Sequence, residues 1–156
     1  MTVFTDGILK EIEEIRVKYP DRKSALIPSL YIAQREYGWL SNEALRLVAD
    51  NLNLPEATVR ATASFYSLFK NKPTGRHLIQ LCTNVSCMIL GSEKLQDFLG
   101  SKYGLEPGGT TADGRFSLLI VECIGACDCA PSMFVNEDSY DDLTEQNIDV
   151  ILGKYR

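Results

Sequence analysis

The five cysteines of this chain all lie between residues 82 and 129, and the first 81 residues contain none. Cys82 and Cys87 form one group, and after 35 intervening residues Cys123, Cys127 and Cys129 form another. Thiols gathered in this way serve a metal site, disulfide bonds or redox catalysis. A metal site that takes ligands from both groups would join distant parts of the chain, so the cysteines constrain the fold strongly.

The composition is that of an ordinary globular protein, with 45% hydrophobic and 24% charged residues. A net charge of −5 and scattered Lys and Arg argue against nucleic-acid binding, which needs a basic surface. The N-terminus carries Asp6 where a signal peptide carries positive charge, and no apolar run approaches the ~18 residues that span a bilayer. We therefore expect a cytoplasmic protein without direct membrane insertion. In that reducing compartment, and with an odd number of thiols, disulfides are disfavoured.

Residues 1–70 predict a small helical bundle. Apolar residues recur at helical spacing in four segments, with polar residues between them. The expected helices are residues 7–18, a helix from Ser24 to Gly38, one that Ser41 caps, and a short one with Pro55 at its first position.

Residues 71–156 predict an α/β domain that begins at a turn-rich break over residues 72–75. The predicted order is strand, helix, strand, strand, strand, helix, which is typical of a small sheet covered by helices. The two domains together predict an α+β protein. The expected elements are strands at 77–82 and 116–121, a helix at 92–104, a hairpin within 133–140 and a helix at 144–153.

Each cysteine group follows a predicted strand. If the two strands are neighbours and parallel, the loops after them meet at one edge of the sheet and bring four thiolates together. Either a zinc ion or a [2Fe-2S] cluster needs such a set. The spacing lacks the Cys-x2-Cys knuckles of zinc sites and the Cys-x-x-Cys motif of thioredoxin catalysis. It therefore favours a two-iron cluster, with zinc and thiol chemistry still open.

The sequence ECIGAC at residues 122–127, followed by Ala130 and Pro131, resembles the E-C-[LI]-G-A-C-x-x-A-P element of the thioredoxin-like [2Fe-2S] ferredoxins. Residues 82–92 are similar to the first ligand pair of this family, and residues 109–116 to the lead-in to its second strand. The N-terminal domain is similar as well, and the resemblance covers nearly the whole chain. The matching segments there are ALIP at 25–28, GWLS at 38–41 and SFYSLF at 64–69.

This resemblance implies a thioredoxin-like domain with a [2Fe-2S] cluster on Cys82, Cys87, Cys123 and Cys127, and no catalytic residue of its own. It also implies an electron-transfer subunit of an NADH:quinone oxidoreductase, peripheral to the membrane through its parent complex. The implied partner is a flavoprotein subunit that binds FMN, oxidises NADH and exchanges single electrons with the cluster. Hydride transfer would belong to that partner, since this chain has no Gly-x-Gly-x-x-Gly turn opening a helix.

Two alternatives to an NADH:quinone oxidoreductase subunit remain. Similar chains serve NAD-linked hydrogenases and NAD-linked formate dehydrogenases, and we favour the NADH:quinone oxidoreductase because we expect the chain to be a complete subunit without fused domains. A zinc-stabilised interaction module without a redox role is the alternative from another class, and the long motif match argues against it.

Several other residues carry weaker expectations. Cys129 occupies a variable position of the motif, so we expect either a bystander thiol or a substitute for Cys127. The carboxylate of Glu122 is expected to lower the reduction potential of a neighbouring cluster. A single histidine, His77, excludes a Rieske-type site, which needs two, and is expected to be structural. Four aromatic residues are expected to form the seam between the domains rather than a docking surface: Trp39, Phe65, Tyr66 and Phe69.

Overall fold

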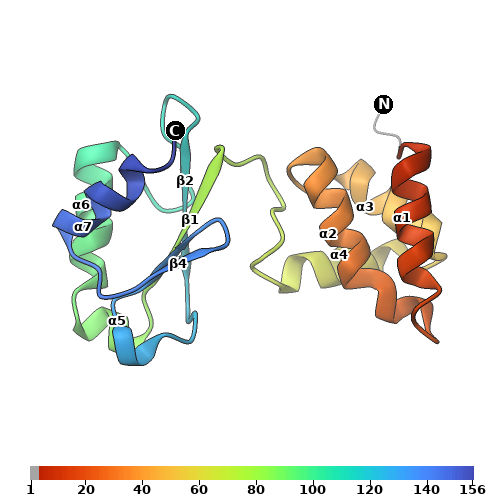
Figure 1. Ribbon diagram of the computed structural model, residues 1–156, viewed down its shortest axis with the longest axis horizontal. Coiled ribbons are helices and arrows are strands. Elements are labelled where there is room, and N and C mark those ends of the chain that lie inside the picture. Colours follow the sequence, from red (N-terminus) through yellow and green to blue (C-terminus); the bar gives the residue numbers. More distant parts are fainter. Residues whose placement is uncertain (1–3) are drawn as a thin grey trace. The chain divides into compact units, whose positions relative to one another are not determined.

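A computed structural model of the chain describes residues 4–156, and its elements are labelled in Figure 1. The chain divides into two compact units, residues 1–73 and residues 74–156. The division falls after Pro73, inside the turn-rich segment between the two predicted domains. Residues 1–3 lie outside the described residues. They belong to the predicted helical domain and to the N-terminal segment in which the sequence shows no signal-peptide pattern.

The first unit is helical, as its apolar spacing predicts. Its helices turn apolar stripes toward one core, in which Leu30 and Leu52 are fully buried. Within residues 4–156, no helix combines the length and the apolar character that crossing a bilayer requires. The elements of this unit are α1 (Asp6–Arg16), the 3-10 helix η1 (Arg22–Ala25), α2 (Leu26–Tyr37), α3 (Asn42–Leu52) and α4 (Glu56–Phe65).

Several helix ends differ from the sequence-based bounds. The helix α2 begins at Leu26 rather than at Ser24, because residues 22–25 form the 3-10 helix η1. The helix α1 ends at Arg16 rather than at residue 18, because Lys18 N donates to Ile15 O, three residues back, and this tightens the last turn. Pro55 precedes α4 in an extended conformation, and the helix begins one residue later than expected. The cap at Ser41 is confirmed, since its hydroxyl accepts a hydrogen bond from Ala44 N at 3.1 Å.

The second unit is a four-stranded sheet with helices, and its strands and long helices confirm the predicted order. Two short elements, α5 and η2, were not predicted, and both lie in the cysteine loops. The elements are β1 (His77–Cys82), α5 (Val85–Ile89), α6 (Ser92–Tyr103), β2 (Phe116–Val121), the 3-10 helix η2 (Cys127–Cys129), β3 (Met133–Val135), β4 (Asp138–Tyr140) and α7 (Glu145–Gly153).

The strands lie in the order β2-β1-β3-β4. The pair β1 and β2 is parallel, whereas β3 is antiparallel to both β1 and β4. The helices α6 and α7 lie side by side against the sheet (Figure 1), where Tyr103 of α6 donates a hydrogen bond to Asp149 of α7 at 2.6 Å. Residues from both helices and from β1 to β3 share one core, which includes Ile79, Leu99 and Ile148. A smaller apolar cluster surrounds Cys82 and Cys87.

Candidate metal centre

The two cysteine groups meet because β1 and β2 end in register. Cys82, the last residue of β1, pairs with Val121, the last residue of β2. Thr83 N then donates to Val121 O at 3.1 Å, so the chain leaves both strands at the same edge of the sheet. The parallel neighbours on which the predicted site depends are therefore present. Cys82 N also donates to Ser132 O at 3.1 Å, which brings the segment before β3 to the same edge.

The first loop folds into the short helix α5. The side chain of Asn84 accepts a hydrogen bond from Val85 N at 2.8 Å and caps this helix. The helix turns Cys87 inward, and this residue keeps 1% of its surface exposed. Cys82, at the end of β1, keeps 2%. The first pair of predicted ligands therefore lies on the inner side of the site.

The second loop holds the outer pair. Cys123 and Cys127 are both exposed. Between them Gly125 adopts φ +87°, a left-handed conformation in which glycine avoids the strain of a side chain. Its N–H donates to Cys123 Sγ at 3.4 Å, and such a donor stabilises a thiolate. The loop continues into η2 and then into a cis peptide bond between Ala130 and Pro131.

The thiols interact with one another in two pairs. Burial raises the pKa of Cys82, and the neighbouring Cys87 raises it further. The pKa of Cys127 is raised first by the neighbouring Cys123, with a further contribution from the charge of Cys82, while the hydroxyl of Ser86 lowers it. The structure therefore brings the four predicted ligands into one region.

This arrangement suits two metal ions better than one. The thiols lie as two pairs, Cys82 with Cys87 and Cys123 with Cys127. A tetrahedral zinc ion needs four ligands about one centre, whereas a [2Fe-2S] cluster places two cysteine thiolates on each of two irons. Two adjacent pairs of thiols therefore fit the two-iron cluster.

Hydrogen-bond partners surround the inner sulfurs. The Sγ of Cys87 lies 3.7 Å from the hydroxyl of Ser132, and both side chains are buried. The thiol of Cys82 donates to Glu122 O at 3.6 Å. Sequence reasoning did not identify Ser132, because nothing in its local pattern separates it from other serines, and the contact depends on a fold that joins positions 45 residues apart.

The other candidate residues are not members of the two thiol pairs. Cys129 is half-buried, and its pKa is raised first by the charge of Asp128, then by burial and by Asp142 and Asp141. Glu122 is exposed beside Cys123. His77 begins β1, at the opposite end from Cys82, and its Nε2 lies 3.3 Å from Arg156 O, which agrees with a structural role.

The aromatic residues near the end of the helical unit have different environments. Phe69 is buried in the core of that unit and packs edge-on against Tyr31, with ring centroids 5.3 Å apart. Phe65 is 79% exposed, and Tyr66 packs against it edge-on. Phe69 therefore stabilises the helical unit itself, while a seam formed by the other aromatic residues stays a prediction.

The chain resembles known proteins along most of its length. The family model described as "Thioredoxin-like [2Fe-2S] ferredoxin" matches residues 12–156. The chain is 45% identical to the NADH-quinone oxidoreductase subunit designated "E 2" of Rhizobium meliloti (strain 1021), over 94% of this chain and 88% of that protein. It is 39% identical to the NADH-quinone oxidoreductase subunit designated "E" of Escherichia coli (strain K12), over 93% of this chain and 87% of that protein.

Among solved structures, the chain resembles part of an NAD+-reducing [NiFe]-hydrogenase in the air-oxidized state. The TM-score is 0.71 at 29% sequence identity, and the match covers 83% of this chain. It covers only 22% of the hydrogenase chain, so the likeness is to a fifth of that larger chain.

Proposed function

Since this chain belongs to the thioredoxin-like [2Fe-2S] ferredoxin family, we propose that it is the [2Fe-2S] electron-transfer subunit of an NADH:quinone oxidoreductase. The relatives from Rhizobium meliloti and Escherichia coli support this function, because both are subunits of such an oxidoreductase and match over most of their length. The observation that carries the proposal is the meeting of two thiol pairs at the carboxyl ends of β1 and β2.

The four residues that would hold the cluster are Cys82, Cys87, Cys123 and Cys127. When bound, a [2Fe-2S] cluster supplies a carrier of single electrons. The chain's own residues divide the site into two sides. Cys82 and Cys87 are buried against the sheet, while Cys123 and Cys127 face solvent. The buried pair anchors the site, and the exposed pair leaves one side open to a redox partner.

The partner in this proposal is a flavoprotein subunit that binds FMN and oxidises NADH. Two-electron hydride chemistry takes place there, and this chain exchanges one electron at a time with the flavin. The chain reaches the membrane only through the parent complex. Residues 71–156 act as the redox domain, and residues 1–70 as a helical domain that precedes it.

The direct test is the electron paramagnetic resonance spectrum of anaerobically purified protein, before and after dithionite, with the iron and zinc content. We expect a silent oxidised sample, a rhombic S = 1/2 signal on reduction and about two irons per chain. A colourless protein with about one zinc per chain and no signal would overturn the proposal in favour of a zinc-stabilised interaction module.

A second candidate, the equivalent subunit of an NAD-linked hydrogenase, is supported by the likeness to the NAD+-reducing [NiFe]-hydrogenase. The higher identity to the two NADH-quinone oxidoreductase relatives favours the quinone-linked complex. Purification of a tagged chain from its host separates the two. Quinone reduction by NADH in the purified complex supports the first candidate, and hydrogen-dependent reduction of NAD+ supports the second.

A further inference from the structure

The two thiol pairs are alike in their contacts and unlike in their access to solvent. The side chains of Cys82 and Cys87 hydrogen-bond to each other, and so do those of Cys123 and Cys127. We call them the inner pair and the outer pair. The outer pair is exposed, whereas both members of the inner pair are buried. A reagent in solution therefore meets two pairs of the same chemistry with unequal access.

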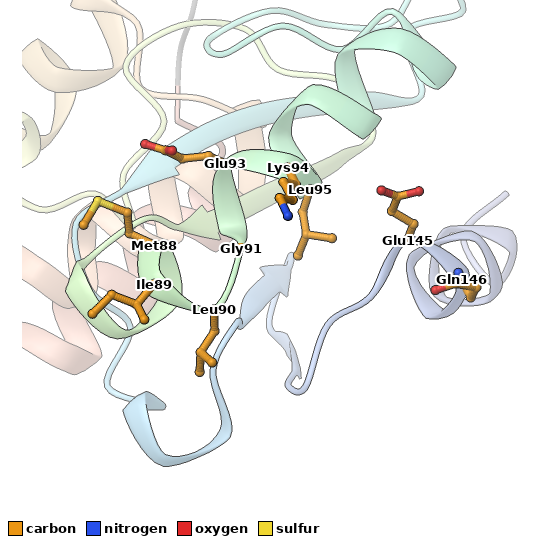
Figure 2. Close-up of a pocket in the computed structure, with 9 residues that line it drawn as sticks. All are labelled: Met88, Ile89, Leu90, Gly91, Glu93, Lys94, Leu95, Glu145 and Gln146. Atoms are coloured by element: carbon orange, nitrogen blue, oxygen red, sulfur yellow. The ribbon is translucent and has the colours of Figure 1, made fainter.

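Packing closes off the inner pair. The helix α5 turns Met88 and Ile89 toward solvent (Figure 2), where they are 45% and 73% exposed, and it turns Cys87 inward. Both inner sulfurs belong to a small apolar cluster, and the Cys87 sulfur lies 3.7 Å from the buried hydroxyl of Ser132. A water-soluble oxidant reaches these sulfurs only when the fold opens locally.

The outer pair lies on a surface loop that turns back on itself. Gly125, between the two cysteines, has φ +87°, and its N–H donates to Cys123 Sγ at 3.4 Å. Cys127 follows two residues later, at the start of η2. A disulfide needs the two Cβ atoms about 3.5–4.5 Å apart. Thiols that already hydrogen-bond to each other across a surface loop reach this separation without movement of the sheet.

Cys129 is the competing thiol near the outer pair. It lies two residues beyond Cys127 in η2 and is half-buried. Its side chain hydrogen-bonds to Asp128, whereas Cys127 hydrogen-bonds to Cys123. The contacts therefore favour Cys123 over Cys129 as the partner of Cys127.

We propose that the outer pair is a reversible oxidation site. In the chain that has not yet received its cluster, a hydroperoxide joins Cys123 and Cys127 in a disulfide and leaves the inner pair as thiols. This inference rests on the proposed function and adds a means of regulating the same site. A [2Fe-2S] cluster needs four ligands, so the oxidised chain accepts no cluster until a reductant restores the outer pair.

The reaction balances in two steps. One outer thiol attacks an oxygen of the hydroperoxide, so that an S–O bond forms, the O–O bond breaks, and a sulfenic acid and an alcohol (water, for hydrogen peroxide) result. The other outer thiol then attacks this sulfur, so that the S–S bond forms, the S–O bond breaks and water leaves. The two sulfurs lose two electrons, which the hydroperoxide gains. A dithiol reductant returns two electrons and two protons and reverses the change.

The test treats the full chain with a stoichiometric amount of hydrogen peroxide, after a chelator has removed its iron under anaerobic, reducing conditions and the reductant has been taken away. The protein is then unfolded, alkylated and digested with trypsin. Trypsin separates the two cysteine groups, because residues 77–94 hold the inner pair and residues 116–154 hold the other three cysteines. Mass spectrometry should find the second peptide lighter by two hydrogen atoms, with Cys129 alkylated, and the first peptide alkylated at both cysteines.

Two variants and a measurement of iron complete the test. Cys129→Ala is the matched control, which should keep both the disulfide and the cluster, whereas Cys123→Ala should form no disulfide. On reconstitution with iron and sulfide, the peroxide-treated wild type should take up less iron than the reduced chain by about tenfold or more. A dithiol reductant should then restore about two irons per chain.

The outcomes separate this inference from the proposed function. A reduced wild-type chain that takes up no iron and gives no reduced-state signal contradicts the proposed function itself. If the reduced chain does take up the cluster, the oxidation site alone is overturned by the absence of a disulfide, by a disulfide in the inner pair or to Cys129, or by equal iron uptake after peroxide. A cluster-free chain that circular dichroism shows to be unfolded, with four thiols that are alkylated at equal rates, also overturns it.

Discussion

The hydroxyl of Ser132 lies 3.7 Å from the sulfur of Cys87, across the edge of the sheet, and both side chains are buried. A ligand thiolate has no proton to donate, so with a cluster bound the serine is the donor. A hydrogen bond to a ligand sulfur stabilises the negative charge that reduction adds to the site. The fold therefore gives one of the inner ligands a stabilising partner that water does not reach.

Replacing Ser132 with Ala is expected to lower the midpoint potential of the cluster. Loss of a buried hydrogen bond of about 1 kcal/mol corresponds to about 40 mV for a one-electron couple. A redox titration followed by electron paramagnetic resonance measures this shift, and Ser139→Ala on the exposed strand β4 is the control. An unchanged potential with a full iron content would show that this serine only fills space.

Glu122→Gln is expected to raise the midpoint potential, because it removes a negative charge next to Cys123. Glu122 is exposed, so water and salt screen its charge, and the shift should be smaller than that of Ser132→Ala. The same titration at low and high ionic strength checks this, since the difference between wild type and variant should shrink as salt rises. Equal potentials at low salt would exclude any electrostatic role for this carboxylate.

Cys129→Ala is expected to keep about two irons per chain and an unchanged spectrum. Cys129 lies outside the two interacting thiol pairs, and its own pKa is raised first by the charge of Asp128. Iron analysis and the reduced-state spectrum measure the outcome, and loss of iron would make Cys129 a ligand.

The companion variant Cys127→Ala tests whether Cys129 can act as a substitute ligand. Cys129 lies two residues further along the same 3-10 helix, η2. Partial iron that disappears in the double variant Cys127→Ala/Cys129→Ala would identify Cys129 as that substitute. Complete loss of iron in Cys127→Ala alone would leave Cys129 as a bystander.

The sequence predicted the strands of the redox unit and the meeting of the four cysteines because these follow from local patterns. Both strands are apolar runs with turn signals around them, and each ends where its cysteine loop begins.

The sequence did not predict α5, because five residues do not complete two helical turns and show no apolar period. Asn84 was the available signal, since asparagine is a preferred helix cap.

The contact of Ser132 with Cys87 and the groove at the starts of α6 and α7 (Figure 2) had no such signal. The groove depends on how the starts of α6 and α7 approach each other, although these helices lie about 50 residues apart in the chain. The exposure of the apolar residues at 85–90 likewise follows from tertiary packing.

Residues 74–156 are expected to fold and hold the cluster without the helical unit. The core around Ile79 and Ile148 draws its buried residues from this unit alone, as does the smaller cluster around Cys82. Expression of this segment should give a cooperative thermal transition in circular dichroism and the same reduced-state spectrum as the full chain. A segment that is unfolded or free of iron would mean that the helical unit is needed for the redox unit to fold.

The contact between Tyr103 and Asp149 should make the stability of the second unit depend on alkaline pH. Burial and the hydrogen bond to Asp149 raise the pKa of Tyr103 to about 12, from an ordinary value of 10.0. The neutral phenol is therefore favoured in the folded state. Its contribution is fully present below about pH 10, and it is lost as pH rises through about 12.

We expect Tyr103→Phe to lower the free energy of unfolding by about 1 kcal/mol at pH 7, because one hydrogen bond to a carboxylate is lost. The difference between wild type and variant should disappear by about pH 12, where the wild-type phenol also ionises. This difference should also shrink at acid pH. Lys102 and Tyr103 lower the pKa of Asp149, so the carboxylate's contribution is lost as pH falls through this lowered pKa.

Urea unfolding across this pH range measures the difference, with Tyr19→Phe in the helical unit as the control. A difference that does not change with pH would mean that Tyr103 stabilises the unit through packing of its ring alone.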